Sequence, residues 1–148
     1  MAIHITPDLE TSLLIHSDEV EGTQLFKDSS TYGHTVSYTG AVHHDTGSPS
    51  KFGRSSMYFD GGGENLTIAD HSSFDFGYGD FTIDFWLRLN SAGGNKNYIS
   101  RRRSSGTDTL WYFRTEHGPE YQFNWNDGSN NYNMLGGVPE TNVWHHLA

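Results

Sequence analysis

The chain has 148 residues, enough for one domain with a buried core, and we expect residues 1–148 to form a single domain. Its 18 acidic and 9 basic residues give a formal charge of −9, which would repel phosphates and excludes nucleic acid as a partner. The absence of cysteine excludes a disulfide framework and a thiolate metal site.

The composition indicates an all-β protein. Glycine (17), phenylalanine (9), tyrosine (8) and tryptophan (4) are abundant. Glycine breaks helices, and aromatic side chains suit a pleated, half-buried surface. The first residues carry neither a basic region nor an apolar stretch of signal-peptide length, and no segment is long and apolar enough to span a bilayer. We therefore expect no membrane insertion and no export by a signal encoded here.

The first half of the chain predicts several short strands. After a possible helical turn at 7–10, residues 13–16 read as a buried strand, and residues 34–38 form the next. Residues 56–59 follow, with Met57 and Phe59 facing inward, and Gly61–Gly63 separates them from a strand at 65–68.

The second half contains the clearest strand pattern. From 81 to 89, apolar and polar residues alternate, which puts Phe81, Ile83, Phe85, Leu87 and Leu89 on one face. A short strand at 98–100 precedes the basic run 101–103, which we interpret as a solvated hairpin face. Residues 110–113 and 121–125 predict a hairpin, and residues 143–147 a last strand. Many short strands between turn-rich stretches predict an antiparallel sandwich or barrel.

The order of these motifs resembles the laminin-G-like members of the concanavalin A-like lectin/glucanase superfamily, of the type found in bacteriophage and bacterial surface proteins. The resemblance runs from Leu13 to Ala148. It is carried by the segments 13–16, 26–34, 51–53, 56–61, 74–76, 79–83, Trp86 and Trp144-His145-His146-Leu147-Ala148. It implies a two-sheet β-sandwich of the concanavalin A-like jelly-roll type.

The end of the chain departs from the family pattern. Further strands follow the Trp-His-His-Leu-Ala segment in the family, whereas this sequence stops at Ala148. We therefore expect an incomplete domain with exposed strand edges, which a homo-oligomer or a neighbouring subunit could complete.

Catalytic patterns are missing from the sequence. Glucanase relatives carry Glu-x-Asp-x-x-Glu on one strand, and no such run occurs. Glu116 and Glu120 flank a predicted hairpin loop, four residues apart, which fits neither one strand face nor a known carboxylate pair. The pairs His43-His44 and His145-His146 point to opposite faces of a strand, so we expect structural roles for them. We predict that the protein is not an enzyme.

Calcium is the one metal for which the sequence offers candidate ligands. Asp60, Glu64 and Asn65 supply carboxylate and amide oxygens within one loop, and relatives hold calcium near their glycan-binding rim. The loop 126–131, with Asp127 and Asn130, has a similar content. The alternative for each loop is polar turn chemistry without an ion.

One segment has the composition of a glycan-contact loop. Sugar sites combine aromatic faces with amides and carboxylates. The predicted contact residues are Trp125, Asn126, Asp127, Asn130, Asn131 and Tyr132. The alternative is that Trp125 belongs to the core and the rest is an ordinary turn.

Three hypotheses for function follow. The first is a non-catalytic, lectin-like recognition module that binds a glycan in a phage virion or at a bacterial surface; a phage product assembled in the host cytoplasm fits the missing export signal. The second is a structural decoration protein of a capsid or tail that binds virion proteins. The third, a glycoside hydrolase, has the least support.

Overall fold

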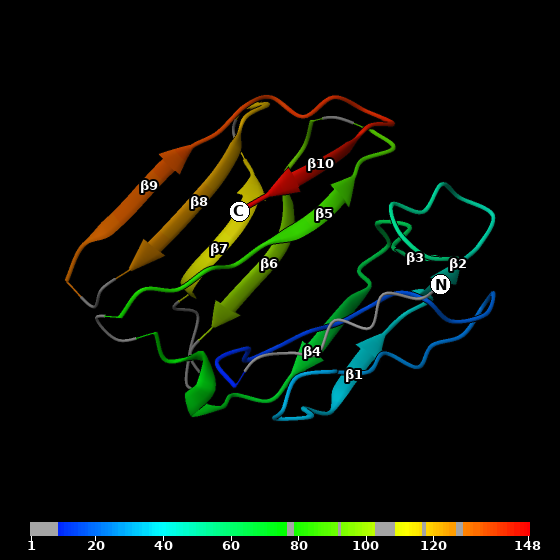
Figure 1. Cartoon of the computed structure of the whole chain (residues 1–148). Coiled ribbons are helices and arrows are strands. Elements are labelled where there is room, and N and C mark those ends of the chain that lie inside the picture. Colours follow the sequence, from blue (N-terminus) through cyan, green and yellow to red (C-terminus); the bar gives the residue numbers. More distant parts are fainter. Residues whose placement is uncertain (1–8, 77–78, 92, 103–108, 117, 127–128) are drawn as a thin grey trace. The chain divides into compact units, whose positions relative to one another are not determined.

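The computed structural model describes residues 9–76, 79–91, 93–102, 109–116, 118–126 and 129–148. Antiparallel strands dominate this part of the chain, which confirms the all-β prediction (Figure 1). The elements are β1 (Val36–Thr39), β2 (His43–Asp45), β3 (Ser56–Tyr58), β4 (Asn65–Ile68), η1 (Ser72–Phe74), β5 (Phe85–Arg88), β6 (Lys96–Arg102), β7 (Thr109–Thr115), β8 (Tyr121–Asn126), β9 (Asn131–Leu135) and β10 (Trp144–Leu147).

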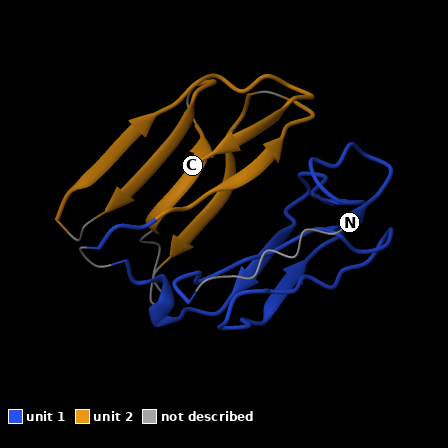
Figure 2. Cartoon of the chain, viewed as in Figure 1, with its two compact units in different colours: residues 1–81 blue, residues 82–148 orange. Residues whose placement is uncertain are grey.

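The chain divides into two compact units, residues 1–81 and residues 82–148 (Figure 2). We describe each unit by itself. The prediction that residues 1–148 form a single domain stays a prediction.

The first unit contains two small antiparallel pairs, β1 with β4 and β2 with β3. Its long connections are held by the buried carboxylate of Asp28, which is 4% exposed. Asp28 Oδ1 accepts the backbone N–H groups of Leu14 (3.0 Å) and Ser30 (2.8 Å). Its Oδ2 accepts the hydroxyl of Ser30 (2.7 Å) and the backbone N–H of His34 (2.8 Å). These four hydrogen bonds offset the cost of burying the charge and tie three chain segments together.

His44 forms a second buried anchor in this unit. It is fully buried, its ring stacks on Phe26 with the ring centroids 4.8 Å apart, and both ring nitrogens have partners. Nδ1 lies 2.7 Å from Ser17 Oγ, and Nε2 lies 3.0 Å from the carbonyl oxygen of Leu25. The structural role predicted for this histidine is confirmed.

The second unit has two layers. Strands β6, β7, β8 and β9 form an antiparallel sheet in that order, and β5 pairs with β10. The β5–β10 pair packs on one face of the four-stranded sheet, where Phe85 meets Phe113 edge to face, with centroids 5.4 Å apart. His145, on the face of the β5–β10 pair that packs on the sheet, contacts Tyr121 of β8. His146 stacks on Trp86, on the other face of the pair. The prediction that the two histidines face opposite sides of a strand is therefore confirmed.

Some predicted elements were wrong in type or extent. Residues 13–16 form only an isolated bridge, between Ile15 and Asp28, because Asp28 bonds this segment through its side chain. The strand predicted at 81–89 is limited to β5, and Phe81 stacks on Phe76 instead of entering a sheet. Phe59 is 45% exposed, because β3 ends at Tyr58 and a glycine turn follows, with Gly61 at a φ of 88°.

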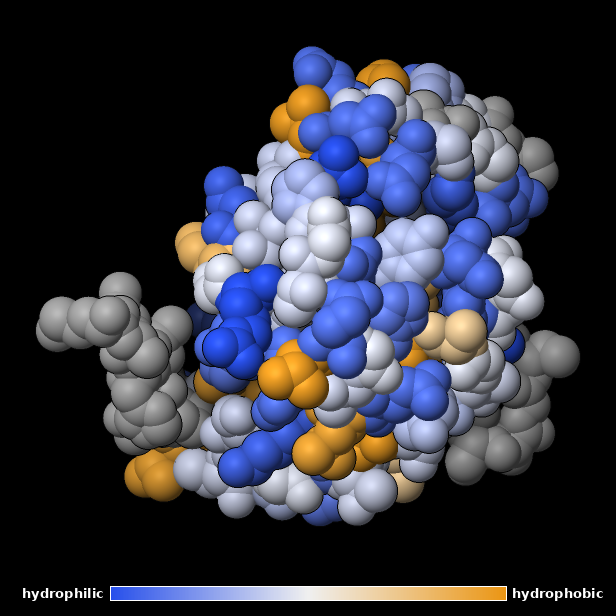
Figure 3. All heavy atoms as spheres, turned by 90° about the vertical axis from the view of Figure 1, so that its right-hand side faces the viewer, coloured by the Kyte–Doolittle hydropathy of each residue, from blue (hydrophilic) through white to orange (hydrophobic). Residues whose placement is uncertain are grey.

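The surface is mixed in polarity. Hydrophobic side chains on the face drawn in Figure 3 form small separate groups among polar ones. Within the described residues, no helix has the length and apolar character required to cross a membrane.

Candidate functional site

The register of the four-stranded sheet sorts its side chains onto two faces. Directly opposed residues lie on the same face, so the strand pairings define rows across the sheet. One row is Asn97, Arg114, Gln122 and Leu135, the next is Ser100, Tyr112, Asn124 and Asn133, and the last is Asn126 and Asn131. We call these ten residues the polar face.

The opposite face is aromatic and carries the core of this unit. Its rows include Ile99, Phe113, Phe123 and Met134, and then Trp111, Trp125 and Tyr132. Phe113 is 9% exposed and contacts both Phe85 and Phe123. The β5–β10 pair covers part of this face and its side chains are mostly apolar, so the polar face is the side of the sheet that can present amides to a ligand.

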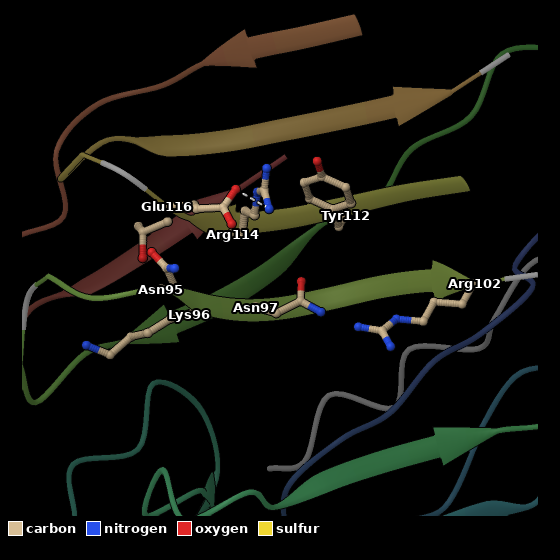
Figure 4. A pocket seen from close by; sticks show the side chains of 8 residues that line it. Asn95, Lys96, Asn97, Arg102, Tyr112, Arg114 and Glu116 are labelled. Atoms are coloured by element: carbon tan, nitrogen blue, oxygen red, sulfur yellow. Dashed lines mark ion pairs between the residues drawn. The ribbon is translucent and has the colours of Figure 1, made fainter. Parts of the chain in front are cut away.

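An open hollow of about 180 Å³ lies between β6 and β7, and Asn97, Tyr112 and Arg114 of the polar face are among its lining residues (Figure 4). Its lining residues are Asn95, Lys96, Asn97, Arg102, Tyr112, Arg114, Thr115 and Glu116. The hollow is small beside the roughly 300–1,000 Å³ of sites for drug-sized ligands. It has room for one small polar group, such as the ring of a single sugar.

Arg114 contacts two other lining residues of the hollow. Its guanidinium lies 4.2 Å from the centroid of the Tyr112 ring and forms an ion pair with Glu116 (Figure 4). The backbone carbonyl of Glu116 accepts a 2.8 Å hydrogen bond from the side-chain amide of Gln122, on β8. At the other side, Lys96 Nζ donates to the carbonyl of Gly93 at 2.7 Å. These contacts hold the side chains in one arrangement before any ligand binds.

Two buried polar atoms of the polar face have no hydrogen-bond partner in the described part of the chain. They are Asn124 Oδ1 and Arg114 Nε, an acceptor and a donor. A buried polar group left without a partner costs about 1–3 kcal/mol. A ligand or water that supplied both partners would recover that free energy.

The charge of the hollow comes from its lysine, arginines and glutamate. Thr115 Oγ1 lies 3.1 Å from the hydroxyl of Tyr98. Burial raises the pKa of Tyr98, and burial together with the neighbouring Tyr98 raises the pKa of Tyr121 to about 12. Both phenols are therefore neutral at pH 7. The charged lining residues are Lys96, Arg102 and Arg114, with Glu116 as the single carboxylate among them.

The structure divides the predicted contact segment between the two faces. Trp125 and Tyr132 stack on the aromatic face, with centroids 4.8 Å apart and planes 14° apart. Asn126 and Asn131 lie on the polar face, where Asn126 Nδ2 donates to Asn131 Oδ1 at 2.7 Å. Asn130 is exposed in the connection between β8 and β9. Asp127 lies outside the described residues.

The predicted calcium loop is closed by its own hydrogen bonds. Glu64 Oε2 accepts the backbone N–H groups of Asp60 (2.8 Å) and Gly61 (3.1 Å), and Asp60 Oδ1 accepts that of Gly62 (2.5 Å). Among the described residues, no group of three or more histidine, aspartate or glutamate side chains could hold a metal ion. Asn65 bonds within the same segment, through its Oδ1, to Thr67. One oxygen of each carboxylate is thus used by the backbone of its own loop, and calcium binding at this loop stays a prediction.

The sequence of this chain matches one family model. The model describes the concanavalin A-like lectin/glucanases superfamily and matches residues 60–148, which is more than half of the chain. The chain belongs to this superfamily. Membership confirms the superfamily that the motifs indicated, whereas the phage or bacterial-surface type stays a prediction. The antiparallel strands agree with a concanavalin A-like sandwich. Searches of curated proteins and of solved structures gave no match.

Several residues that line the hollow of this concanavalin A-like domain match no functional motif, among them Asn97, Tyr112 and Arg114. Glu116 was weighed only as half of a carboxylate pair, and Arg102 only as part of the basic run 101–103. The usable signal was alternation in 121–126, where Gln122, Asn124 and Asn126 occupy every second position. Three amides on one strand face indicate a surface built for hydrogen bonding.

Proposed function

We propose that this concanavalin A-like domain is a non-catalytic recognition module that binds carbohydrate on the polar face of the β6–β9 sheet. The observation that carries the proposal is the hollow around Arg114 and Tyr112, with a row of side-chain amides beside it. We further propose that the module works in a phage virion or at a bacterial surface, which rests on the resemblance of its motifs.

The side chains of the polar face match the chemistry of a sugar. Each amide offers two donors and an acceptor with two lone pairs, and a hydroxyl group uses both kinds of partner. Asn97 is exposed at the edge of the hollow, and Asn124 Oδ1 supplies an acceptor that lacks a partner within the described residues. The face of the Tyr112 ring that Arg114 does not cover adds an apolar surface for sugar C–H groups.

The charge of the hollow favours a glycan with an acidic group. Lys96, Arg102 and Arg114 stand against Glu116 alone, although the whole chain carries a charge of −9. Glu116 and Arg114 neutralise one another in an ion pair. An exposed guanidinium such as that of Arg102 binds a carboxylate in a bidentate manner, so a uronic or other acidic sugar suits this end of the hollow.

The same geometry gives little support to hydrolysis. Most glycosidases use two carboxyl groups, about 5–5.5 Å apart in retaining enzymes and about 6.5–9.5 Å apart in inverting ones. The lining residues of the hollow include one carboxylate, Glu116, and it is already paired with Arg114. We therefore propose binding without turnover.

A glycan array with the purified chain, followed by titration with the best ligand, tests this proposal. Arg102→Glu reverses a charge on an exposed side chain of the hollow and should weaken binding by about tenfold or more. Arg54→Glu makes the same change on an exposed side chain of the first unit and should leave binding unchanged. Equal effects of the two substitutions, or release of sugar from the ligand, would contradict the proposal.

A second candidate is a structural role in a virion, in which the domain binds neighbouring protein subunits. The exposed strand β9 at the edge of the sheet favours it. Stoichiometric incorporation into particles together with no signal on the array would support this candidate over the first.

A further inference from the structure

Strand β9 is the outer strand of the four-stranded sheet and is exposed along its whole length (Figure 1). Its apolar side chains occur on both faces: Tyr132 and Met134 on the aromatic face, Leu135 on the polar face. Met134 is 59% exposed and Leu135 is 65% exposed. Among the described strands, only β8 pairs with β9.

Strand β9 itself carries neither the charged side chains nor the proline that keep many strand edges apart. Natural edge strands carry lysine, an inward charge, proline or a bulge. The sequence has no charged residue from Gly128 to Pro139, and no proline inside β9, in a chain with 27 charged residues, 18 acidic and 9 basic. A second molecule can therefore approach this edge without the charge repulsion that the rest of an acidic chain presents.

The backbone of β9 alternates between its neighbour β8 and the open edge. Tyr121 exchanges hydrogen bonds with the start of the next connection: Gly136 N–H donates to Tyr121 O at 2.8 Å, and Tyr121 N–H donates to Gly137 O at 3.0 Å. Counting from there in steps of two, Met134 and Tyr132 direct their N–H and C=O groups to β8. The backbone N–H and C=O groups of Asn131, Asn133 and Leu135 therefore point toward the open edge.

We propose that β9 pairs antiparallel with β9 of a second copy of this chain, about a two-fold axis at Asn133. In this register Asn133 opposes Asn133, Asn131 opposes Leu135, and Tyr132 opposes Met134. The outward backbone groups of Asn131, Asn133 and Leu135 then form the hydrogen-bonded pairs of the ladder. The register brings methionine sulfur to an aromatic ring and amide to amide, so the strand is complementary to itself.

The pairing has a consequence for ligand binding. A two-fold axis between antiparallel strands runs perpendicular to the sheet, so both copies present their polar faces on the same side. Two hollows on one continuous sheet could engage one polymer or one surface together, and avidity would then exceed the affinity of either site. The dimer itself does not depend on what the hollow binds.

The oligomeric state of the full chain over a range of concentrations tests the pairing, by light scattering after size exclusion and by sedimentation. The account predicts a dimer. Asn133→Lys places two like charges directly opposite each other and should give a monomer with unchanged circular dichroism. Thr31→Lys adds the same charge on an exposed residue of the first unit and should remain dimeric.

A cysteine substitution tests the register. The chain has no cysteine, so Asn133→Cys introduces a single thiol. A hydrogen-bonded antiparallel pair has its Cα atoms about 5.5 Å apart, within the range of about 4.4–6.8 Å that a disulfide spans. Mild oxidation should link Asn133→Cys into a covalent dimer much faster than Thr31→Cys. A monomeric wild-type chain, a dimer that survives Asn133→Lys, or equal cross-linking of both thiols would overturn the proposal.

Discussion

The Asp28 carboxylate offers the sharpest test of how the first unit is stabilised. Replacing Asp28 by asparagine keeps the shape and leaves Oδ1 to accept from Leu14 and Ser30, as observed at 3.0 and 2.8 Å. The amide NH₂ then takes the place of Oδ2, opposite the N–H of His34, which lies 2.8 Å from Oδ2. The Ser30 hydroxyl can turn to accept from the new NH₂, whereas the His34 N–H cannot.

The expected loss of stability follows from these contacts. One buried donor without a partner costs about 1–3 kcal/mol, and the remaining hydrogen bonds lose the strength that a charged acceptor gives them. We expect Asp28→Asn to lower the free energy of unfolding by about 3 kcal/mol, a large share of the 5–15 kcal/mol typical of a domain. Asp80→Asn, at an exposed position, is the control and should change it little.

The choice of probe matters because all four tryptophans, at 86, 111, 125 and 144, lie in residues 82–148. Urea unfolding should therefore be followed by circular dichroism and by tryptophan fluorescence on the same samples. If residues 1–148 form a single cooperative domain, Asp28→Asn will shift both transitions together. A loss below about 0.5 kcal/mol would refute the account of Asp28 as an anchor.

The effect of Asp28 should also depend on pH. Burial alone would raise its pKa, but the hydrogen bonds from Leu14, Ser30 and His34 outweigh burial and lower it below the usual value. A carboxyl group whose pKa is lower in the folded chain stabilises it at pH values above the unfolded pKa, near 3.9, and loses that contribution as the pH falls through the folded value. The difference between wild type and Asp28→Asn should therefore shrink as the pH falls below about 4.

Three further predictions concern the cores and the glycine loop. Phe113→Ala removes a ring that touches Phe85 and Phe123 and should cost about 3 kcal/mol in urea unfolding; a cost near zero would show that the aromatic face is not a packed core. His44→Phe removes the hydrogen bonds to the Leu25 carbonyl and to the Ser17 hydroxyl, which keeps only its contact with Ser55, and should cost about 2 kcal/mol; equal stability would show that these hydrogen bonds contribute nothing. Because Glu64 already accepts backbone N–H groups, calcium should not change the melting temperature, and a calcium-dependent rise lost in Glu64→Gln would support the calcium prediction.

The sequence predicted a strand well where apolar and polar residues alternate in it and where it pairs with a neighbouring strand of similar length. β7 and β8 alternate cleanly around a short turn, so the hairpin at 110–125 was predicted nearly as found. β9 was missed because Asn131 and Asn133 read as turn residues; hydrogen bonding to β8 outweighs their low strand propensity. The same alternation divides the predicted contact segment, since it sends Trp125 and Asn126 to opposite faces of the sheet.

The hollow could not be predicted from the sequence. Tyr112 and Arg114 share a face only because β7 is a continuous strand. Asn97 lies on the same face because it pairs with Arg114, just before a bulge in β6 between Asn97 and Ile99. The number of residues between β6 and β7 gives no hint of that register. The Asp28 anchor was equally hidden, because Leu14 and His34 reach it from both sides through backbone groups that carry no sequence signal.

Amide chemical-shift mapping tests the central claim most directly, with ¹⁵N-labelled chain titrated with the strongest ligand from the array. The account predicts that the largest shifts fall on Asn97, Arg102, Arg114 and the side-chain amide of Asn124, and that Arg102→Glu requires about tenfold more ligand or more to reach the same shifts. Largest shifts around Trp86 and His146, on the opposite side of the β5–β10 pair, would contradict it.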